Sequence, residues 1–402
     1  MYFLIEEFNI YILTKFLILL IIYLLIFLYL APRLKLNKYE IIFIVILHLF
    51  FLFFYSYIFN KQNNDAIQSY FYCYEDHRPF YNPKLSYKST DNLVWFVKNL
   101  CNILGQNYLL IATNFNLIGS FGIIILYSCL KKINQNKNIF NYSLLIIIFS
   151  PSIFFWTSTI SKDTICFTGL CLMLYYLNNS NLKNIFLLIL SLILIFFSKP
   201  HIFILTSSIL LFLLFLKYNI SIYAKILIIF IGSLPIYYLL LLLLNYSGYT
   251  YISTSASTIY DLKLSITSIQ EYFNTFSYRF RYSDGYIDEI FIIRLFNLFL
   301  IPKLSETYSM TSLFLGIETV ILLFIFLYFS ILLPNRNYIS RNILTIQFSY
   351  LFILVMLIFY SITIYNTGVF LRQKIFILPF IFYLFLDRLY FQKNFGNEKK
   401  SN

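Results

Sequence analysis

The sequence predicts an all-helical protein that crosses a membrane many times. Of its 402 residues, 60% are hydrophobic and only 12% are charged, about half the charged share of a soluble domain. Uncharged apolar runs, such as residues 16–30 and their flanks, recur from end to end. A bilayer core of about 30 Å is crossed by about 20 helical residues. Because no water in that core can satisfy a backbone amide, such runs must form helices.

The apolar runs between charged or turn-forming breaks define about eleven predicted spans. They cover 12–31, 41–60, 104–130, 138–158, 163–178, 184–198, 202–217, 223–245, 312–333, 342–365 and 371–387. The first run is too long for a signal-peptide core and lacks a small-residue cleavage site, so we predict a span there. We expect a single integral membrane domain over 1–402, with long polar segments at 61–103 and 246–311 and a basic tail at 388–402.

Basic residues in the short loops predict the orientation. Loops after the odd-numbered spans carry most of them, including Arg33, Lys35, Lys38, Lys131, Lys132 and Lys137, whereas the opposite short loops hold only Lys162, Lys199, Arg372 and Lys374. We therefore expect the amino terminus outside and the carboxyl terminus in the cytoplasm. Both long polar segments and most acidic residues then lie on the outer face, which is where we expect the chemistry.

Composition also argues against two classes of site. The formal charge of +13 is distributed between apolar spans instead of forming one basic patch, so we expect lipid head groups and no nucleic acid as partners. The five cysteines and three histidines show no metal-ligand spacing, so we expect no metal. Cys73 and Cys101 could form a disulfide across the first polar segment.

Charged residues at the ends of spans are the first candidates for chemistry, because burying a charge in a membrane is costly. Pro151 is expected to kink its helix and to direct Trp156 to the interface. Lys162 and Asp163 follow and point about 100° apart on a helix, so we expect them to serve other partners. The alternatives are an interfacial anchor with a capping carboxylate, or a phosphate-binding lysine.

Two further breaks carry cations on the predicted outer side. Lys199, Pro200 and His201 separate two short spans, which form either a hairpin with a sunken apex or two tilted spans. Arg372 and Lys374 are expected at the start of the last helix, where positive residues outside suit a polyanion partner. Head-group snorkelling is the alternative for this pair.

The long polar segments supply the remaining candidates. Arg279 and Arg281 alternate with aromatic residues, a pattern that suits either stacking on sugars or a half-buried interfacial helix. Glu318 is an intramembrane acid and hence a functional or pairing candidate. Asp65 follows the second span, where it could act as a base, bind a sugar hydroxyl or be a solvated loop acid.

In this order, these motifs resemble bacterial multi-span O-antigen and capsule polymerases over positions 60–380. The matching stretches are Asp65-Ala66 with Tyr70, Pro151-Ser152 through Trp156 to Lys162-Asp163, Lys199-Pro200-His201, Arg294 with Pro302-Lys303 and Glu318, and Asn366 through Arg372-Gln373-Lys374 to Leu378-Pro379. Two departures are visible: Lys199 stands where the family is expected to have an arginine, and the 294–303 stretch has one arginine and a lysine.

The resemblance implies a GT-C-like or O-antigen-polymerase-like bundle in the bacterial cytoplasmic membrane. Such an enzyme transfers a growing glycan from one undecaprenyl-diphosphate carrier to the next repeat unit, without a cofactor and with other assembly proteins as potential partners. The reaction needs cations for the diphosphate leaving group, for which we expect Arg372, Lys374, Lys162 and Lys199. It also needs a base, for which Asp65, Asp163 and His201 are candidates. For contacts with the glycan we expect Arg279, Arg281, Glu318 and Trp156.

Three rival functions remain open from the sequence. A polyprenyl-phosphosugar-dependent glycosyltransferase would place acids in the first outer segment, where Glu75 and Asp76 lie. A lipid-linked oligosaccharide flippase would show polar residues along the spans and two comparable halves, and no internal repeat is visible. A non-catalytic assembly partner is the third.

Overall fold

The computed structural model describes residues 10–59, 70, 73, 89–133, 142–179, 184–217, 316–322, 324–325, 342–363 and 367–401. Within these ranges every regular element is a helix and there is no strand, which confirms the predicted all-helical class. Among the described residues, four helices are long and apolar enough to cross a membrane, at Ile10–Leu34, Lys38–Tyr57, Tyr108–Ile133 and Ile343–Ser361. The predicted span 223–245 and the segment 246–311 lie outside the described residues. The chain divides into two compact units, Met1–Pro200 with Phe382–Asn402, and His201–Ile381.

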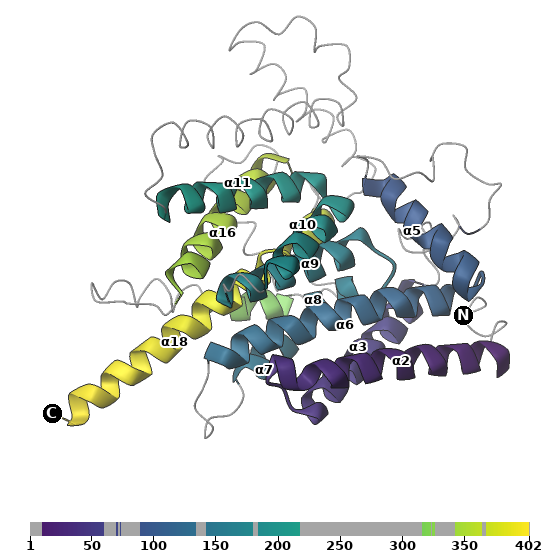
Figure 1. The fold of residues 1–402 in the computed structure, drawn as a ribbon, viewed down its shortest axis with the longest axis horizontal. Coiled ribbons are helices and arrows are strands. Elements are labelled where there is room, and N and C mark those ends of the chain that lie inside the picture. Colours follow the sequence, from purple (N-terminus) through teal and green to yellow (C-terminus); the bar gives the residue numbers. More distant parts are fainter. Residues whose placement is uncertain are drawn as a thin grey trace, which may run out of the picture. The chain divides into compact units, whose positions relative to one another are not determined.

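At the centre of the first unit, helix α9 (Lys162–Asn178) lies between helices α6 (Tyr108–Ile133) and α10 (Ile185–Ser198). The other described helices of this unit are α2 (Ile10–Leu34), α3 (Lys38–Phe59), α5 (Ser89–Leu104), α7 (Tyr142–Ile148), α8 (Pro151–Thr157) and, from Phe382 onward, α18 (Leu378–Ser401). Helix α9 packs against both α6 and α10, and α3 and α2 pack on α6, as Figure 1 shows. Helix α6 is consequently buried along almost its whole length, whereas α2 buries only Phe27, Ala31 and Leu34.

Glycines allow the central helices to approach closely. A Cβ atom at Gly169 would lie 2.8 Å from Ile195 Cγ1 and 3.1 Å from the Ser191 carbonyl oxygen, both on α10. At Gly122 it would lie 2.8 Å from Thr168 Oγ1 on α9. Small residues at helix contacts are typical of membrane bundles, whose stability depends on close van der Waals packing. The contact at Gly169 holds α9 against α10 and so brings their ends together.

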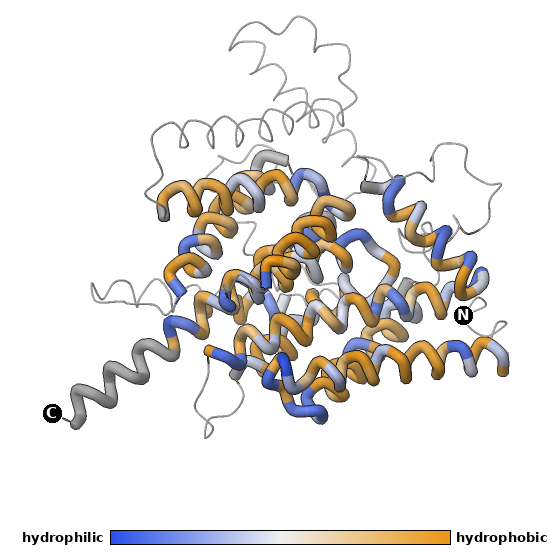
Figure 2. The backbone as a smooth tube through the Cα atoms, in the orientation of Figure 1, coloured by the Kyte–Doolittle hydropathy of each residue, from blue (hydrophilic) through white to orange (hydrophobic). Residues whose placement is uncertain are grey.

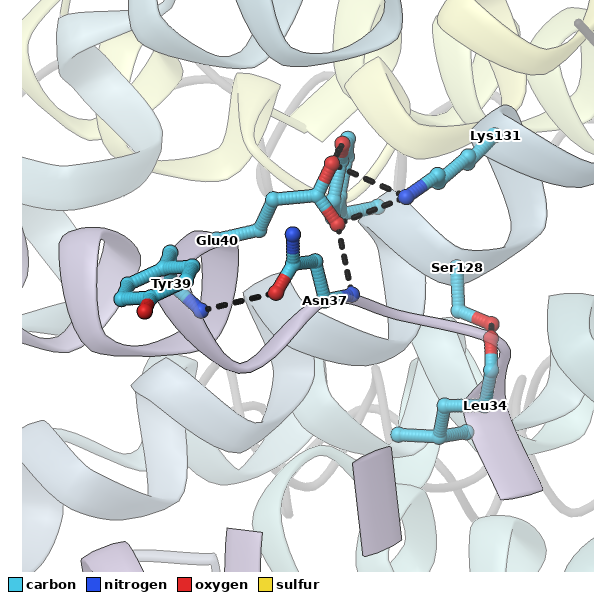
Figure 3. Close-up of polar contacts among 7 residues, drawn as sticks. Leu34, Asn37, Tyr39, Glu40, Ser128 and Lys131 are labelled. Carbon is cyan, nitrogen blue, oxygen red and sulfur yellow. Dashed lines mark hydrogen bonds and ion pairs between the residues drawn. The ribbon is translucent and has the colours of Figure 1, made fainter. Parts of the chain in front are cut away.

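The turn between α2 and α3 is tied to the last turns of α6 by polar contacts. Figure 2 shows that α2 is apolar along most of its length and that polar residues gather in this turn. The Lys131 ammonium lies 2.7 Å from Glu40 Oε2 and 2.9 Å from Oε1, and the Tyr127 hydroxyl donates to Glu40 Oε1 at 2.7 Å. The Ser128 hydroxyl donates to the Leu34 carbonyl oxygen at 2.7 Å (Figure 3). This group of contacts marks the basic end of the first unit.

A disulfide lies toward the other end of the same unit. Cys73 is bonded to Cys101 on α5, which confirms the pairing that the sequence suggested. The Tyr70 hydroxyl donates to the Gln106 carbonyl oxygen at 2.8 Å, and the Gln106 amide donates to the Cys73 carbonyl oxygen at 3.2 Å. Gly105 ends α5 with a φ of 91°, a conformation that glycine adopts without steric cost.

A hydrophobic cluster surrounds this disulfide. Both cysteines pack with residues of α3, α5, α6 and α8, among them Tyr55, Val97 and Phe115. Helix α5 was not predicted, because all but its last residue lies in the polar segment 61–103. Its buried residues Leu93, Val97 and Cys101 recur every four positions, the spacing of one helix face.

The second unit includes α11 (Pro200–Lys217), α16 (Ile343–Thr363), α17 (Thr367–Lys374) and the start of α18 (Leu378–Ser401). Phe348 and Phe352 of α16 pack on Phe380, with ring centroids 5.7 and 4.5 Å apart. Residues 316–322 are also helical, within the predicted span 312–333.

Two predicted helices are interrupted at prolines. The run 138–158 divides into α7 and α8, and Pro151 occupies the first position of α8, where its missing N–H is no loss. The run 371–387 is not one helix: α17 ends at Lys374 and α18 begins at Leu378. Pro379 has no N–H for a bond to residue 375, and its ring would collide with that carbonyl group. Arg372 and Lys374 therefore lie in the last turn of α17, and their expected position at the start of a helix is wrong.

Candidate functional site

A buried ion pair joins the beginning of α9 to the end of α10. The Lys199 ammonium lies 2.6 Å from Asp163 Oδ1, and the two side chains are 4% and 0% exposed. The sequence singled out both residues for a role with other partners but did not pair them. Two charges removed from water are costly unless they are close and hydrogen-bonded, so this pair indicates a specific function for the position.

Local structure holds Asp163 in place. Ser161 is the N-cap of α9, and its hydroxyl oxygen accepts from the Asp163 backbone N–H at 3.0 Å. The same hydroxyl donates to Asp163 Oδ2 at 3.2 Å. A carboxylate in the first turn of a helix also interacts favourably with the helix dipole. Asp163 is thus bound on both sides by the short turn that begins α9.

Lys199 owes its position to the end of α10. Its backbone N–H donates to the Ile195 carbonyl oxygen at 2.7 Å, and it is the single residue between α10 and α11. The close contact at Gly169 keeps α10 against α9 over this length. The lysine side chain therefore reaches back to the start of the neighbouring helix.

Helix α5 covers this region of the first unit. The Asn92 amide donates to the Phe197 carbonyl oxygen at 3.1 Å, two residues before Lys199. Trp95 and Phe96 both contact the Phe197 ring, at centroid distances of 6.3 and 6.2 Å. Because Cys101 lies on the same helix, the ion pair and the disulfide belong to the same end of the unit.

Lys162 and Trp156 flank the ion pair in sequence but occupy different environments. Lys162 is half-buried at the first position of α9. The half-buried Trp156 ring packs edge-on against Phe155 at 5.0 Å and against the hydrophobic cluster. Its Nε1 atom is buried and has no hydrogen-bond acceptor within the described part of the chain.

The second unit holds a separate buried charged group. Lys374 is 3% exposed and donates to Thr319 Oγ1 at 3.3 Å. Glu318, on the same helix as Thr319, is 2% exposed and close enough for a charge–charge interaction with Lys374. Arg372 is half-buried on α17, and His201 stacks on Phe359 with ring centroids 5.6 Å apart.

The predicted site residues thus fall into two groups. The structure brings together Asp163 and Lys199 in the first unit, and Glu318 and Lys374 in the second. Asp65, Arg279 and Arg281 lie outside the described residues, and so do Glu75 and Asp76. Within the described residues, no three His, Cys, Asp or Glu side chains are grouped in a way that could hold a metal.

A second buried polar group in the first unit was not predicted from the sequence. His48, Asn116, Ser120 and Thr157 are all completely buried, and they hydrogen-bond to one another across α3, α6 and α8. A signal was present, because His48 interrupts the predicted span 41–60, and an ionisable residue inside a span is a functional candidate.

No protein-family model, no curated protein and no solved structure matches the chain. The resemblance to polymerases therefore stays an expectation based on short motifs. The buried charges are the stronger basis for inferring a function.

Proposed function

We propose that the protein polymerises undecaprenyl-diphosphate-linked oligosaccharide repeat units at the outer face of the bacterial cytoplasmic membrane. The proposal includes about eleven spans in a GT-C-like or O-antigen-polymerase-like bundle, with the amino terminus outside and the carboxyl terminus in the cytoplasm. The observation that carries it is the buried Asp163–Lys199 pair, a cation and a carboxylate held together below α5.

The two ends of the first unit support this orientation. One end holds basic residues of the short loops, with Lys131 bound to Glu40 and Lys132 donating to the Asn178 carbonyl oxygen at 3.3 Å. The other end holds the disulfide, and disulfides persist in oxidising compartments outside the cytoplasm. Loop charge and cysteine chemistry thus independently favour the same face as the outer one, and the ion pair lies on that face.

The ion pair supplies both groups that glycan transfer requires. A diphosphate leaving group needs cations in a site from which water is excluded, and the acceptor hydroxyl needs a base. In the resting protein Lys199 and Asp163 neutralise each other. An incoming diphosphate competes for Lys199 and thereby frees the Asp163 carboxylate to accept a proton, with the half-buried Lys162 as a second cation.

Charges in the second unit suit the same chemistry. Lys374 is buried beside Glu318 and Thr319, and Arg372 lies two residues away on α17. A guanidinium binds phosphate oxygens with two parallel hydrogen bonds. We assign Arg372 and Lys374 to diphosphate binding and Glu318 to the orientation of Lys374.

A flippase is the second candidate, and one observation bears on it directly. Transporters use unwound helix segments, whose free carbonyl groups coordinate ions, and residues 158–161 form such a break between α8 and α9. Here the Thr164 hydroxyl lies 3.3 and 3.2 Å from the Thr157 and Thr159 carbonyl oxygens, and the Asn116 amide lies 3.4 Å from that of Ser158. The Thr164 hydroxyl and the Asn116 amide thus act as donors toward the carbonyl groups of this break, which favours the enzyme.

Glycan chain length tests the proposed function. In a deletion strain we expect Lys199→Met to leave mostly single repeat units, because the diphosphate loses a buried cation. Lys199→Arg keeps the charge, matches the residue expected in the family and should restore the ladder seen on a gel. Phe186→Leu on the exposed face of α10 is the matched control and should leave the ladder unchanged.

Other outcomes of this experiment distinguish the rival functions. If single capped repeat units also disappear in the deletion strain, the protein acts earlier, as a transferase or flippase, and the polymerase assignment is wrong. If Lys199→Met is expressed normally and extends glycans like wild type, the ion pair is not part of the site.

The disulfide gives an independent test of orientation. We expect Cys73 and Cys101 to be oxidised in cells whose extracytoplasmic thiol oxidation is intact and reduced in cells that lack it, because outer-face disulfides depend on that pathway. Thiol trapping followed by a non-reducing gel separates the two forms. If the thiols remain reduced when the pathway is intact, this end faces the cytoplasm and the proposed orientation fails.

A further inference from the structure

His48 is a completely buried histidine in the middle of α3, and both of its ring nitrogens have hydrogen-bond partners. Nδ1 lies 2.8 Å from the Ser120 hydroxyl on α6, and Nε2 lies 3.0 Å from the Thr157 hydroxyl at the end of α8. The ring also contacts Phe154 edge-on at 5.8 Å. One side chain therefore connects three helices.

The hydrogen bonds assign the proton on the ring. Thr157 Oγ1 donates its single hydrogen to the Ile153 carbonyl oxygen at 2.6 Å, so toward His48 it can only accept. This arrangement favours a hydrogen on Nε2, with the Ser120 hydroxyl donating to Nδ1. The side-chain contacts that the structure describes around the ring include no carboxylate that would stabilise a second proton, so His48 is neutral.

The surroundings of His48 leave little room for it to move. The Asn116 amide donates to the His48 carbonyl oxygen at 2.8 Å, which ties α3 to α6 a second time. A Cβ atom at Gly119 would lie 2.5 Å from the Thr157 carbonyl oxygen and 2.7 Å from His48 Cε1. Helix α6 can pass this point only because residue 119 has no side chain.

Thr157 links His48 to the ion pair. It is the last residue of α8 and is followed by the break at 158–161. The last residue of this break, Ser161, is the N-cap of α9 and accepts from the Asp163 backbone N–H. The Thr164 hydroxyl lies 3.3 Å from the Thr157 carbonyl oxygen, so the end of α8 contacts the first turn of α9 across the break. A shift of Thr157 would therefore displace the turn that positions Asp163 against Lys199.

We propose that His48 is a positioning residue: as a neutral Nε2–H donor to Thr157, it fixes the break before α9 and thereby the geometry of the Asp163–Lys199 pair. The inference rests on the proposed function only where glycan extension is the measurement. Proton location and coupling within the ion pair can be measured whether or not the protein is a polymerase.

Nitrogen NMR of the full-length, histidine-labelled protein tests the proton assignment. The His48 signals are identified by their loss in His48→Gln. We expect one protonated nitrogen, Nε2, and one unprotonated nitrogen, Nδ1. A proton on Nδ1, or on both nitrogens, would overturn the proposal.

Two variants of His48 separate positioning from simple filling of space. His48→Gln places an amide N–H near the position of Nε2, whereas His48→Leu has similar bulk and no donor. We expect His48→Leu to lower the coupling between Asp163 and Lys199 in a double-mutant cycle by about half or more, and His48→Gln to preserve most of it. Glycan extension should fall roughly tenfold in His48→Leu, as for one buried hydrogen-bonding group left unmatched.

Each possible result of this comparison is informative. If the coupling between Asp163 and Lys199 is the same in His48→Leu as in His48→Gln, His48 only fills space and the proposal is wrong. Loss of coupling in His48→Leu together with normal glycan ladders supports the positioning role of His48 and contradicts the catalytic role of the pair. The failure of one proposal can therefore be distinguished from the failure of the other.

Discussion

Lys199→Met is expected to destabilise the folded protein by about 3–5 kcal/mol, because it leaves the Asp163 carboxylate buried without its counter-charge. Asp163 is completely buried, and its partner is 4% exposed, so water cannot replace the lost contact. Asp163→Asn should also destabilise, since it removes the carboxylate charge that lies against the buried Lys199 ammonium. Thermal unfolding of the detergent-purified protein, monitored with wild type in parallel, measures the effect.

The double variant Asp163→Asn/Lys199→Met should recover much of the lost stability, because both charges of the pair are then removed together. It should not recover glycan extension, because neither the cation nor the base is restored. This separation distinguishes a pair that serves chemistry from one that serves only folding. If the double variant regains both stability and extension, the pair is structural and the proposed site is wrong.

The Glu40–Lys131 pair provides a matched control at the other end of the same unit. Its side chains are 19% and 32% exposed, so water screens the charges and the pair should contribute about 1 kcal/mol or less. Lys131→Met is therefore expected to have a much smaller effect than Lys199→Met. Equal effects would mean that the Asp163–Lys199 pair is not buried in the folded protein.

Much of the fold could be predicted from the sequence, because the bilayer imposes a simple rule. The runs 41–60 and 184–198 agree with α3 and α10 to within a few residues, since an apolar run of this length can only be a helix. The rule fails where a proline or an amphipathic pattern intervenes. Pro379 divides the last predicted helix, and α5 has a helical apolar face within a segment too polar to be recognised as a span.

The candidate site was predictable residue by residue but not as an arrangement. Asp163 and Lys199 stood out because charges at the ends of apolar spans are rare, yet their pairing depends on the packing of α9 against α10 at Gly169. His48 was not predicted, because its position inside the run 41–60 gives no indication of its hydrogen-bond partners. Its importance is visible only when Ser120 and Thr157, both distant in sequence, are seen beside it.

Gly119→Ala is expected to destabilise the protein by about 1–3 kcal/mol or more, although it adds a single methyl group to a helix. The added carbon would lie 2.5 Å from the Thr157 carbonyl oxygen and 2.7 Å from His48 Cε1, closer than carbon atoms pack in proteins. Alanine normally stabilises a helix relative to glycine, so the sign of the effect is opposite to that of helix propensity. Thermal unfolding gives the stability, and the gel ladder gives the accompanying loss of glycan extension.

Gly122→Ala, one turn further along α6, is the control for this prediction. Its nearest neighbours are the side-chain atoms Thr168 Oγ1 and Phe167 Cδ1, at 2.8 and 3.1 Å, and a hydroxyl can rotate away more easily than a backbone carbonyl group can move. We therefore expect a smaller loss than for Gly119→Ala.

A second-site variant identifies the atom responsible at Gly119. His48→Ala removes the ring that Gly119→Ala would strike but leaves the Thr157 carbonyl oxygen in place. The double variant Gly119→Ala/His48→Ala should therefore remain at least as unstable as Gly119→Ala alone. Recovery of stability in the double variant would show that the ring, and not the end of α8, sets the spacing between these helices. The break before α9 would then be free to move independently of α6, and the positioning role inferred for His48 would lose its structural basis.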